Sequence, residues 1–421
     1  MSQFVEQRWE GVPEDVVRRI RPVVEQIAEG AAERERERRL PVAEVDLLRD
    51  AGLTLARVPA SEGGWGLGWR PLARVLIAVA AADANLPQIL RGHLALVEQT
   101  ITTADAAFRD RWLQRLRAGA VVGNAWSEPA GKSLARSGTE IVAGADGGLR
   151  VTGRKFYTTG SIFGTWTDAL ASRAEDDAEV AALIPLDQEG VTVLDDWDGF
   201  GQRLTGTGTI LFEEATVDAE DVLPVAERFG YQTAQFQLVL LTVLAGIAQD
   251  AVADAAARVR TRTRVYSHGL AGRAQDDAQI QALIGELAAE AFAVEATVLA
   301  VADAVESAYA ALVAARDGAA SAEDARTAAG LAEIRAAQAQ SVVTAQVQRI
   351  ASRLFDALGA SATARDGGLD RHWRNARTVS SHNPVLYKNR WVGEWVLSDV
   401  LPDPLWSVGT PEAASGSPDA G

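Results

Sequence analysis

The chain has 421 residues, of which 48% are hydrophobic and 23% are charged, a composition typical of a soluble globular protein of two or three domains. Its 57 acidic and 41 basic side chains leave a net charge of −16, which argues against nucleic acid as the main partner. There is no cysteine, so disulfides, thiolate nucleophiles and cysteine-ligated metals are excluded. Any imidazole chemistry must use one of the four histidines, which are His93, His268, His372 and His382.

The start of the chain has neither the basic segment nor the apolar core of a secretory signal. The longest apolar run covers about residues 238–248 and is shorter than the roughly 20 residues needed to cross a bilayer. We therefore expect a cytoplasmic protein without a membrane partner.

Residues 1–119 are expected to form an N-terminal helical domain. Apolar residues from Val16 to Ile27 recur about every 3.6 positions, which predicts an amphipathic helix. The run from Glu33 to Arg39 places opposite charges three and four positions apart, a pattern typical of a solvated helix face. The glycines that follow within residues 62–66 predict a loop.

Residues 120–227 are expected to form a small antiparallel β-barrel. Short runs rich in valine, threonine and isoleucine alternate with turn residues, and no helical pattern separates them. The glycine-rich segment 144–148 predicts a hairpin. The expected strands cover residues 140–143, 149–152, 181–185, 191–194 and 208–212.

Residues 228–400 are expected to form a long four-helix bundle, so that the whole chain is mainly α-helical with a central β domain. Apolar residues from Ile280 to Leu312 alternate spacings of four and three, which predicts one long helix with a continuous packing seam. Asp317 and Gly318 end this helix, and Ser321 with an acid three positions later predicts the start of the next. Residues 401–421 lack periodicity and predict a disordered tail.

Several common catalytic motifs are missing. The sequence has no phosphate-binding loop, no dinucleotide fingerprint, no paired histidines at metal-binding spacing and no serine-hydrolase elbow. We therefore expect no metal centre.

Three segments instead combine aromatic, hydroxyl and amide side chains, which suit the faces and rim of a flat heteroaromatic cofactor. They are Gly123–Pro129 with Gly131 and Ser133, Gly153–Ser161, and Leu369–Pro384.

Short motifs in these segments resemble those of the acyl-CoA dehydrogenase superfamily. Ser127-Glu128-Pro129 with Ser133 is similar to its Thr-Glu-Pro…Gly-Ser motif, and Tyr157-Thr158-Thr159 is similar to its Trp-x-Thr motif at the flavin face. Gly201-Gln202-Arg203-Leu204-Thr205 resembles a further Gly-x-Arg-x-Ser segment. The order helix–β–helix agrees with that family over roughly residues 15–400.

Within the superfamily the chain resembles the dibenzothiophene monooxygenase group. Residues 378–384 hold no carboxylate where a dehydrogenase carries its glutamate base, and His382-Asn383-Pro384 matches the monooxygenases instead. The resemblance implies reduced FMN from a separate reductase, and O2 that forms a C4a-hydroperoxide on the flavin. It also implies a small organic substrate oxygenated at sulfur, nitrogen or aromatic carbon, and a homotetramer.

The resemblance also assigns roles to residues. It places Asn124, Tyr157, Thr159, Trp197 and His382 around the flavin ring. His382 is the expected general acid or base, and Thr159 an expected hydrogen-bond donor. The further cofactor residues expected are Ser127, Ser133, Arg264 and Arg377.

Two of these assignments leave an alternative open. His93 lies on a predicted helix and either faces the substrate or is a structural histidine. Arg264, with Arg262, either binds the flavin phosphate across a subunit boundary or is a solvated helix end. Two other functions also stay open, an acyl-CoA dehydrogenase that uses FAD and a non-catalytic helical scaffold with the same fold.

Overall fold

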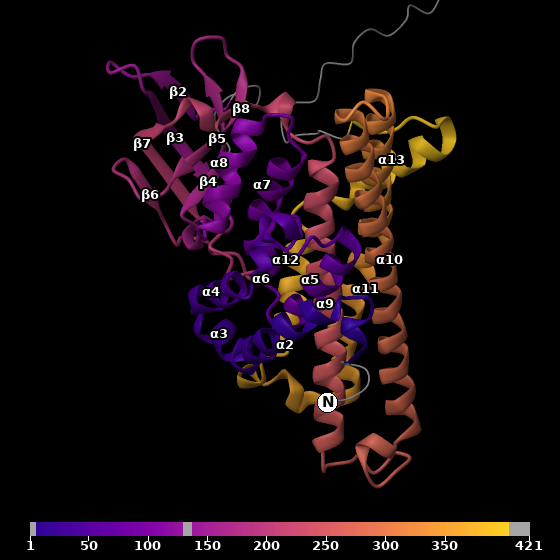
Figure 1. Cartoon of the computed structure of the whole chain (residues 1–421). Helices are drawn as coiled ribbons and strands as arrows, with labels where there is room; N and C mark the ends of the chain where they lie inside the picture. The colour runs from indigo at the N-terminus through magenta and orange to yellow at the C-terminus, as the bar shows by residue number, and fades with distance from the viewer. Residues whose placement is uncertain (1–5, 129–136, 404–421) are drawn as a thin grey trace, which may run out of the picture.

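The computed structural model describes residues 6–128 and 137–403. Ser133 and most of the expected tail lie outside the described residues. Figure 1 shows short N-terminal helices beside a β sheet, with long C-terminal helices running down the other side. The N-terminal helices are α2 (Glu14–Glu29), α3 (Ala31–Glu37), α4 (Val42–Asp50), α5 (Trp69–Ala82), α6 (Leu86–Ile89), α7 (Arg91–Thr102) and α8 (Ala106–Arg117).

Two residues of the charged run in α3 are buried, which corrects the expectation of a solvated helix face. Arg34 and Glu35 were expected on a solvated face, yet they are 2% and 4% exposed. The Arg34 guanidinium forms ion pairs of 3.0 Å with both Glu44 and Asp83. The Glu35 carboxylate accepts a 2.8 Å hydrogen bond from Arg374. These buried ion pairs fix α3 in place, because their partners lie on α4, just after α5 and on a C-terminal helix.

The β domain is one sheet with the strand order β6-β7-β3-β2-β4-β5-β8, and β1 pairs with β4. The expected strands are confirmed. The antiparallel expectation is wrong for two pairings, because β1 and β2 both run parallel to β4. A long connection that includes a hairpin separates β1 from β4, as a parallel pair requires. The strands are β1 (Val122–Ala125), β2 (Glu140–Ala143), β3 (Leu149–Phe156), β4 (Trp166–Arg173), β5 (Glu179–Pro185), β6 (Val191–Val193), β7 (Thr209–Val217) and β8 (Val222–Pro224).

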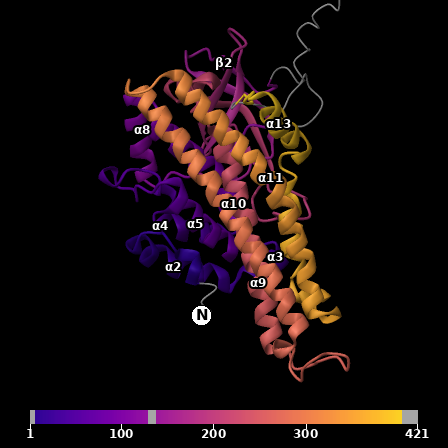
Figure 2. The ribbon, with the colours of Figure 1, turned by 90° about the vertical axis from the view of Figure 1, so that its right-hand side faces the viewer.

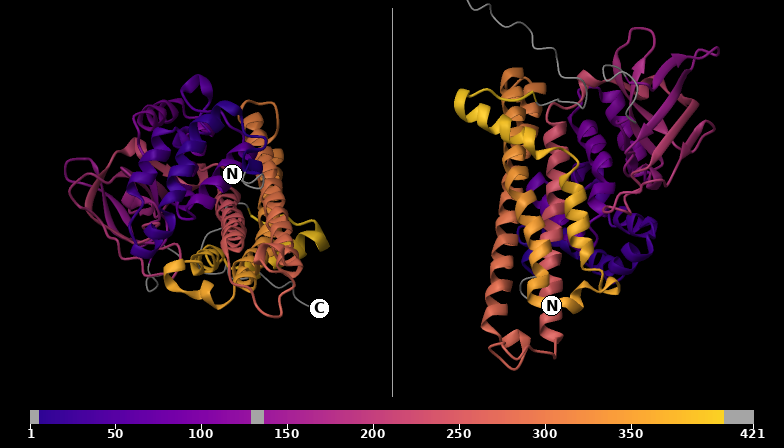
Figure 3. Two further views of the ribbon diagram at one scale, coloured as in Figure 1. Left: turned by 90° about the horizontal axis from the view of Figure 1, so that it is seen from below. Right: turned by 180° about the vertical axis from the view of Figure 1, so that it is seen from behind.

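The long packing seam is confirmed. Its central residues from Leu287 to Ala308 are buried at the predicted spacing. The next helix begins at the predicted capping box, in which the side chains of Ser321 and Asp324 each accept from the other's backbone. Figures 2 and 3 show the C-terminal helices side by side, with α12 against α9 and α11. They are α9 (Gln232–Thr261), α10 (Ala278–Arg316), α11 (Ala322–Leu358), α12 (Asp370–Ser380) and α13 (Val385–Ser398).

Within residues 6–128 and 137–403, two helices are long and apolar enough to cross a membrane by length and composition. The apolar window of α9 is 83% buried inside the protein, as expected for a core helix. The window of α10 is only 33% buried in the single chain.

Candidate functional site

The three polar segments predicted from the sequence meet between the sheet and α12. The Asn124 backbone N–H donates to the Thr159 carbonyl at 3.0 Å, which joins the end of β1 to the turn after β3. The loop before β7 connects both to α12, because the Gln202 backbone N–H donates to the Asn375 side-chain oxygen at 2.6 Å. Gly201 makes this approach possible, since a Cβ there would overlap the Arg374 carbonyl.

Tyr157 has a strained backbone at the centre of this region. Its φ is 61°, a left-handed conformation that is unfavourable for a bulky residue. The ring is 49% exposed and meets Trp197 edge to face with 6.0 Å between ring centroids. The Trp197 indole N–H donates to the Gln202 carbonyl at 3.1 Å, so it is used within the protein. Tyr157 and Trp197 therefore form an aromatic wall that faces solvent in the isolated chain.

A chain of three threonine hydroxyls lies behind Thr159. Thr159 and Thr207 are 2.8 Å apart, Thr207 and Thr205 are 2.7 Å apart, and Thr205 donates to the Gln202 carbonyl at 2.9 Å. Each hydroxyl has one hydrogen to donate. Because Thr205 uses its hydrogen on the carbonyl, Thr207 donates to Thr205 and Thr159 donates to Thr207.

This direction bears on the role of Thr159. When its hydrogen is directed to Thr207, its oxygen lone pairs are left for a ligand. In this arrangement Thr159 is a hydrogen-bond acceptor toward the site, whereas the sequence predicted a donor.

His93 lies in the interior of the single chain, which favours the second, structural interpretation of this residue. The ring is 0% exposed, its Nε2 lies 2.9 Å from the Thr54 carbonyl, and its Nδ1 accepts from the Val122 backbone N–H at 3.4 Å. Burial lowers the pKa of His93 to about 4, although its hydrogen bond to Thr54 opposes the shift. The neutral ring ties α7 to β1.

Asn124 packs against α7, so this helix also borders the site. The Asn124 side chain is buried, and Gly92 on α7 leaves so little room that a Cβ there would lie 3.0 Å from the Asn124 Cβ. Ser127 is exposed just beyond β1, and its carbonyl accepts from the Phe156 backbone N–H at 3.0 Å. Asn124 and Ser127 therefore lie on the segment that borders the Tyr157 turn.

Glu128, in the Ser-Glu-Pro motif, is a structural anchor. Its carboxylate accepts from the buried Lys155 ammonium at 2.6 Å, from the Ser137 hydroxyl at 2.6 Å and from the Gly138 backbone N–H at 2.7 Å. Burial opposes ionisation, but these hydrogen bonds lower the pKa of Glu128 to about 2. The carboxylate therefore holds the start of the loop against β3.

Trp126 belongs to the wall of the β domain. Its indole N–H donates to the Asp168 carboxylate at 3.1 Å, and the buried Arg228 guanidinium lies over its ring at 5.7 Å. Asp168 and Arg228 form an ion pair of 2.8 Å. This buried pair fixes the indole in place.

His382 follows α12 and is exposed to solvent in the single chain. Surrounding protein atoms and the positive charge of Arg91 lower the pKa of its ring. Its Nδ1 accepts from the Asn383 amide at 3.2 Å, which leaves the proton on Nε2. In this arrangement His382 presents a hydrogen-bond donor at Nε2, and its role as a general acid or base stays a prediction.

Two expected cofactor residues are exposed in the single chain. Arg264 lies in the connection between α9 and α10, which Figure 1 shows at the opposite end of the bundle from the sheet. Arg377 lies on α12. Both alternatives for Arg264, the flavin phosphate of a neighbouring subunit and a solvated helix end, fit this position.

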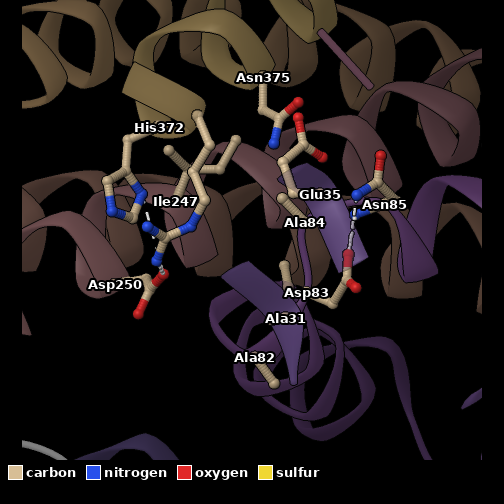
Figure 4. A pocket seen from close by; sticks show the side chains of 12 residues that line it. Ala31, Glu35, Ala82, Asp83, Ala84, Asn85, Ile247, Asp250, His372 and Asn375 are labelled. Carbon is tan, nitrogen blue, oxygen red and sulfur yellow. Dashed lines mark hydrogen bonds and ion pairs between the residues drawn. The ribbon is translucent and has the colours of Figure 1, made fainter. Parts of the chain in front are cut away.

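A second polar cluster surrounds a narrow cavity of about 20 Å³, room for about one water molecule (Figure 4). Asp250, Asp254 and His372 place ligand atoms within 4.8 Å of one another, as a metal site would. The Arg371 guanidinium, however, pairs with Asp250 at 3.0 Å and with Asp254 at 2.8 Å. Both carboxylates thus already share a guanidinium partner, and this cluster joins α12 to α9.

Comparison with known proteins identifies the family. Residues 14–120 match the family model "Acyl-CoA dehydrogenase, N-terminal domain", and residues 238–386 match "Acyl-CoA dehydrogenase, C-terminal domain". The crystal structure of TdsC from Paenibacillus sp. A11-2 with FMN and indole superposes with a TM-score of 0.84 at 30% identity, over 93% of this chain and 99% of that one. The chain belongs to the acyl-CoA dehydrogenase family.

The relatives place it in the flavin-dependent monooxygenase branch. Dibenzothiophene monooxygenase of Mycolicibacterium goodii is 29% identical over 377 residues, which cover 85% of this chain and 87% of the relative. The "probable FMNH2-dependent monooxygenase SfnC" of Pseudomonas putida is 28% identical over 397 residues, which cover 91% and 95%. This acyl-CoA dehydrogenase homologue is an FMNH2-dependent monooxygenase, and FMN is its cofactor. The FAD-dependent dehydrogenase and the scaffold alternatives are therefore not supported.

Sequence reasoning missed how two groups of residues shape this site. Thr205 stood in the Gly201–Thr205 segment and Thr207 alternates with glycine, but only the fold brings both behind Thr159. Arg91 stood out as the one charged residue of the run Leu86–Leu96, close to the histidine that drew attention instead.

Proposed function

We propose that the protein is the oxygenase component of a two-component system. A separate reductase supplies FMNH2, and O2 adds to the flavin to give a C4a-hydroperoxide. One oxygen atom then passes to a sulfur, nitrogen or aromatic carbon atom of a small organic substrate, and the other leaves as water when oxidised FMN forms again. The names of dibenzothiophene monooxygenases, and the indole bound to TdsC, support this substrate class.

The direction of the threonine hydroxyls is the observation that carries the proposal. Reduced flavin has a hydrogen on its N5 atom, whereas N5 of oxidised flavin is an acceptor. Thr159 offers lone pairs toward the site because its hydrogen is used on Thr207. We place Thr159 at N5, where it favours the reduced cofactor that a two-component oxygenase must capture.

The other residues around Thr159 supply the walls of the site. Tyr157 and Trp197 would cover the ring system of FMN, and Asn124 would bond its rim. His382 supports the reactive oxygen as a neutral donor through Nε2, which keeps a proton available without adding a base. Such a site slows the loss of hydrogen peroxide.

The His382→Ala variant tests this assignment. Without the imidazole donor we expect hydrogen peroxide to appear faster when FMNH2-loaded protein meets oxygen, whereas His382→Gln should keep part of the protection because an amide still donates. FMNH2 affinity, measured anaerobically, should change little in either variant. An unchanged rate of peroxide release in the alanine variant would contradict the role given to His382.

We also propose that the protein assembles as a homotetramer through its long helices. Only 33% of the apolar window of α10 is buried in the single chain, and Phe292 on this helix is 73% exposed. On α13, Leu386 and Leu397 are 76% and 88% exposed. Exposed apolar surface of this kind is typical of a subunit interface. Assembly would also give Arg264 a neighbouring subunit whose flavin phosphate it can bind, and light scattering of the purified protein tests it.

A further inference from the structure

Arg91 is a buried arginine without a compensating acid. It opens α7 and is only 5% exposed. Its Nε atom is buried and has no hydrogen-bond partner. Among residues 6–128 and 137–403, no carboxylate pairs with its guanidinium, whose contact is the Phe236 ring on α9 at 4.7 Å. Burial alone, with no carboxylate to oppose it, lowers the pKa of Arg91 to about 10.

The other deeply buried arginines of the described chain are all paired. Arg34 contacts Asp83 and Glu44, Arg57 contacts Glu98, and Arg228 contacts Asp168, each at about 3.0 Å or less. A buried charge without a partner is strongly unfavourable. The fold therefore supplies an internal acid for each of the others and leaves Arg91 without one.

The position of Arg91 connects it to the site. The next residue, Gly92, packs directly against Asn124. The charge of Arg91 is also close enough to His382 to act on that ring. Arg91 thus lies where α7 approaches α9 and the segment after α12.

We propose that Arg91 binds an oxyanion of the substrate, a carboxylate, sulfinate or sulfonate. This inference rests on the proposed function and names the class of substrate within it. A planar guanidinium matches two oxygens of such a group with parallel hydrogen bonds. The protein carries a net charge of −16, so an anionic substrate needs a local cation of this kind to enter. Anchoring the anion beside His382 would hold the rest of a small substrate next to the reactive oxygen.

Binding of matched probes tests the proposal without turnover. Methanesulfonate is compared with dimethyl sulfone, and benzoate with benzamide, on FMN-loaded protein by calorimetry and thermal unfolding. We expect each anion to bind the wild type at least about tenfold more tightly than its neutral partner, a difference of one charge-assisted contact. Arg91→Gln should abolish this preference, Arg91→Lys should keep part of it, and the exposed control Arg326→Gln should keep all of it.

Folding does not obscure the result. Because Arg91→Gln removes an unpaired buried charge, the ligand-free variant should unfold at the same temperature as the wild type or higher. FMN affinity, measured separately, should stay unchanged, so a failure of flavin binding in the wild type would be recognised as a failure of the proposed function. An Arg91→Gln variant that loses FMNH2 and keeps anion binding would assign Arg91 to the flavin and overturn the inference. A wild type that does not prefer the anions would overturn it too.

Discussion

The direction of the hydroxyl chain predicts how one buried methyl group changes the redox preference of the site. In the Thr205→Val variant, Thr207 loses its acceptor at 2.7 Å and turns its hydrogen toward Thr159. Thr159 must then direct its own hydrogen into the site. It would become a donor, which suits oxidised FMN and opposes the N5–H of the reduced form. The Gln202 carbonyl loses the Thr205 hydroxyl in this variant but still accepts from the Trp197 indole N–H, so the loop before β7 should hold its position.

The size of the effect follows from one hydrogen bond gained and one lost. A net hydrogen bond contributes about 1 kcal/mol, so the preference for FMNH2 over FMN should fall by about 1–2 kcal/mol, or roughly 5–30-fold in the ratio of dissociation constants. For a two-electron couple this lowers the midpoint potential of bound FMN by about 20–45 mV.

Anaerobic titration of each redox form measures this ratio in the wild type, Thr205→Val and Thr205→Ser. The serine variant keeps the hydroxyl and should behave like the wild type. Equal ratios in all three proteins, or a valine variant that prefers FMNH2 more strongly, would refute the assigned direction.

Three further outcomes concern the stability of the fold. Arg34→Met removes the buried guanidinium that pairs with both Asp83 and Glu44 and should lower the free energy of unfolding by about 3–5 kcal/mol in urea. Arg36→Met, at an exposed position of the same helix, should stay within about 0.5 kcal/mol of the wild type. Because the folded-state pKa of His93 is about 4 and its unfolded value is about 6.5, its contribution is complete above pH 6.5 and is lost as pH falls. Unfolding free energy should therefore drop by about 3 kcal/mol between pH 6.5 and 4 through this group alone, and a His93→Gln variant with the same pH slope would contradict that.

Elements fixed by local periodicity could be predicted from the sequence. The apolar spacing from Ile280 to Leu312 predicted the helix that extends over Ala278–Arg316, because one helix face must meet its neighbours along the whole length. Ser321 with Asp324 predicted where the next helix begins, since both partners of a capping box lie within four residues.

Features that depend on distant partners could not be predicted. The burial of Arg34 depends on Asp83, 49 positions away, so the local charge pattern pointed to solvent. The parallel pairing of β1 with β4 also joins strands that are far apart in the sequence, so no local pattern indicates it. In the site, residue type indicated that Thr159 belongs there, but the direction of its hydrogen is set by Thr205 and Thr207 across the loop.

Rapid mixing of the anaerobic FMNH2 complex with oxygenated buffer tests the proposed oxygenation most directly. We expect the near-ultraviolet absorbance of a flavin adduct to form first and oxidised FMN to appear only in a later, slower phase together with hydrogen peroxide. Oxidised FMN that appears in a single phase, as fast as free FMNH2 oxidises, would contradict a site built to keep the oxygenating flavin intact.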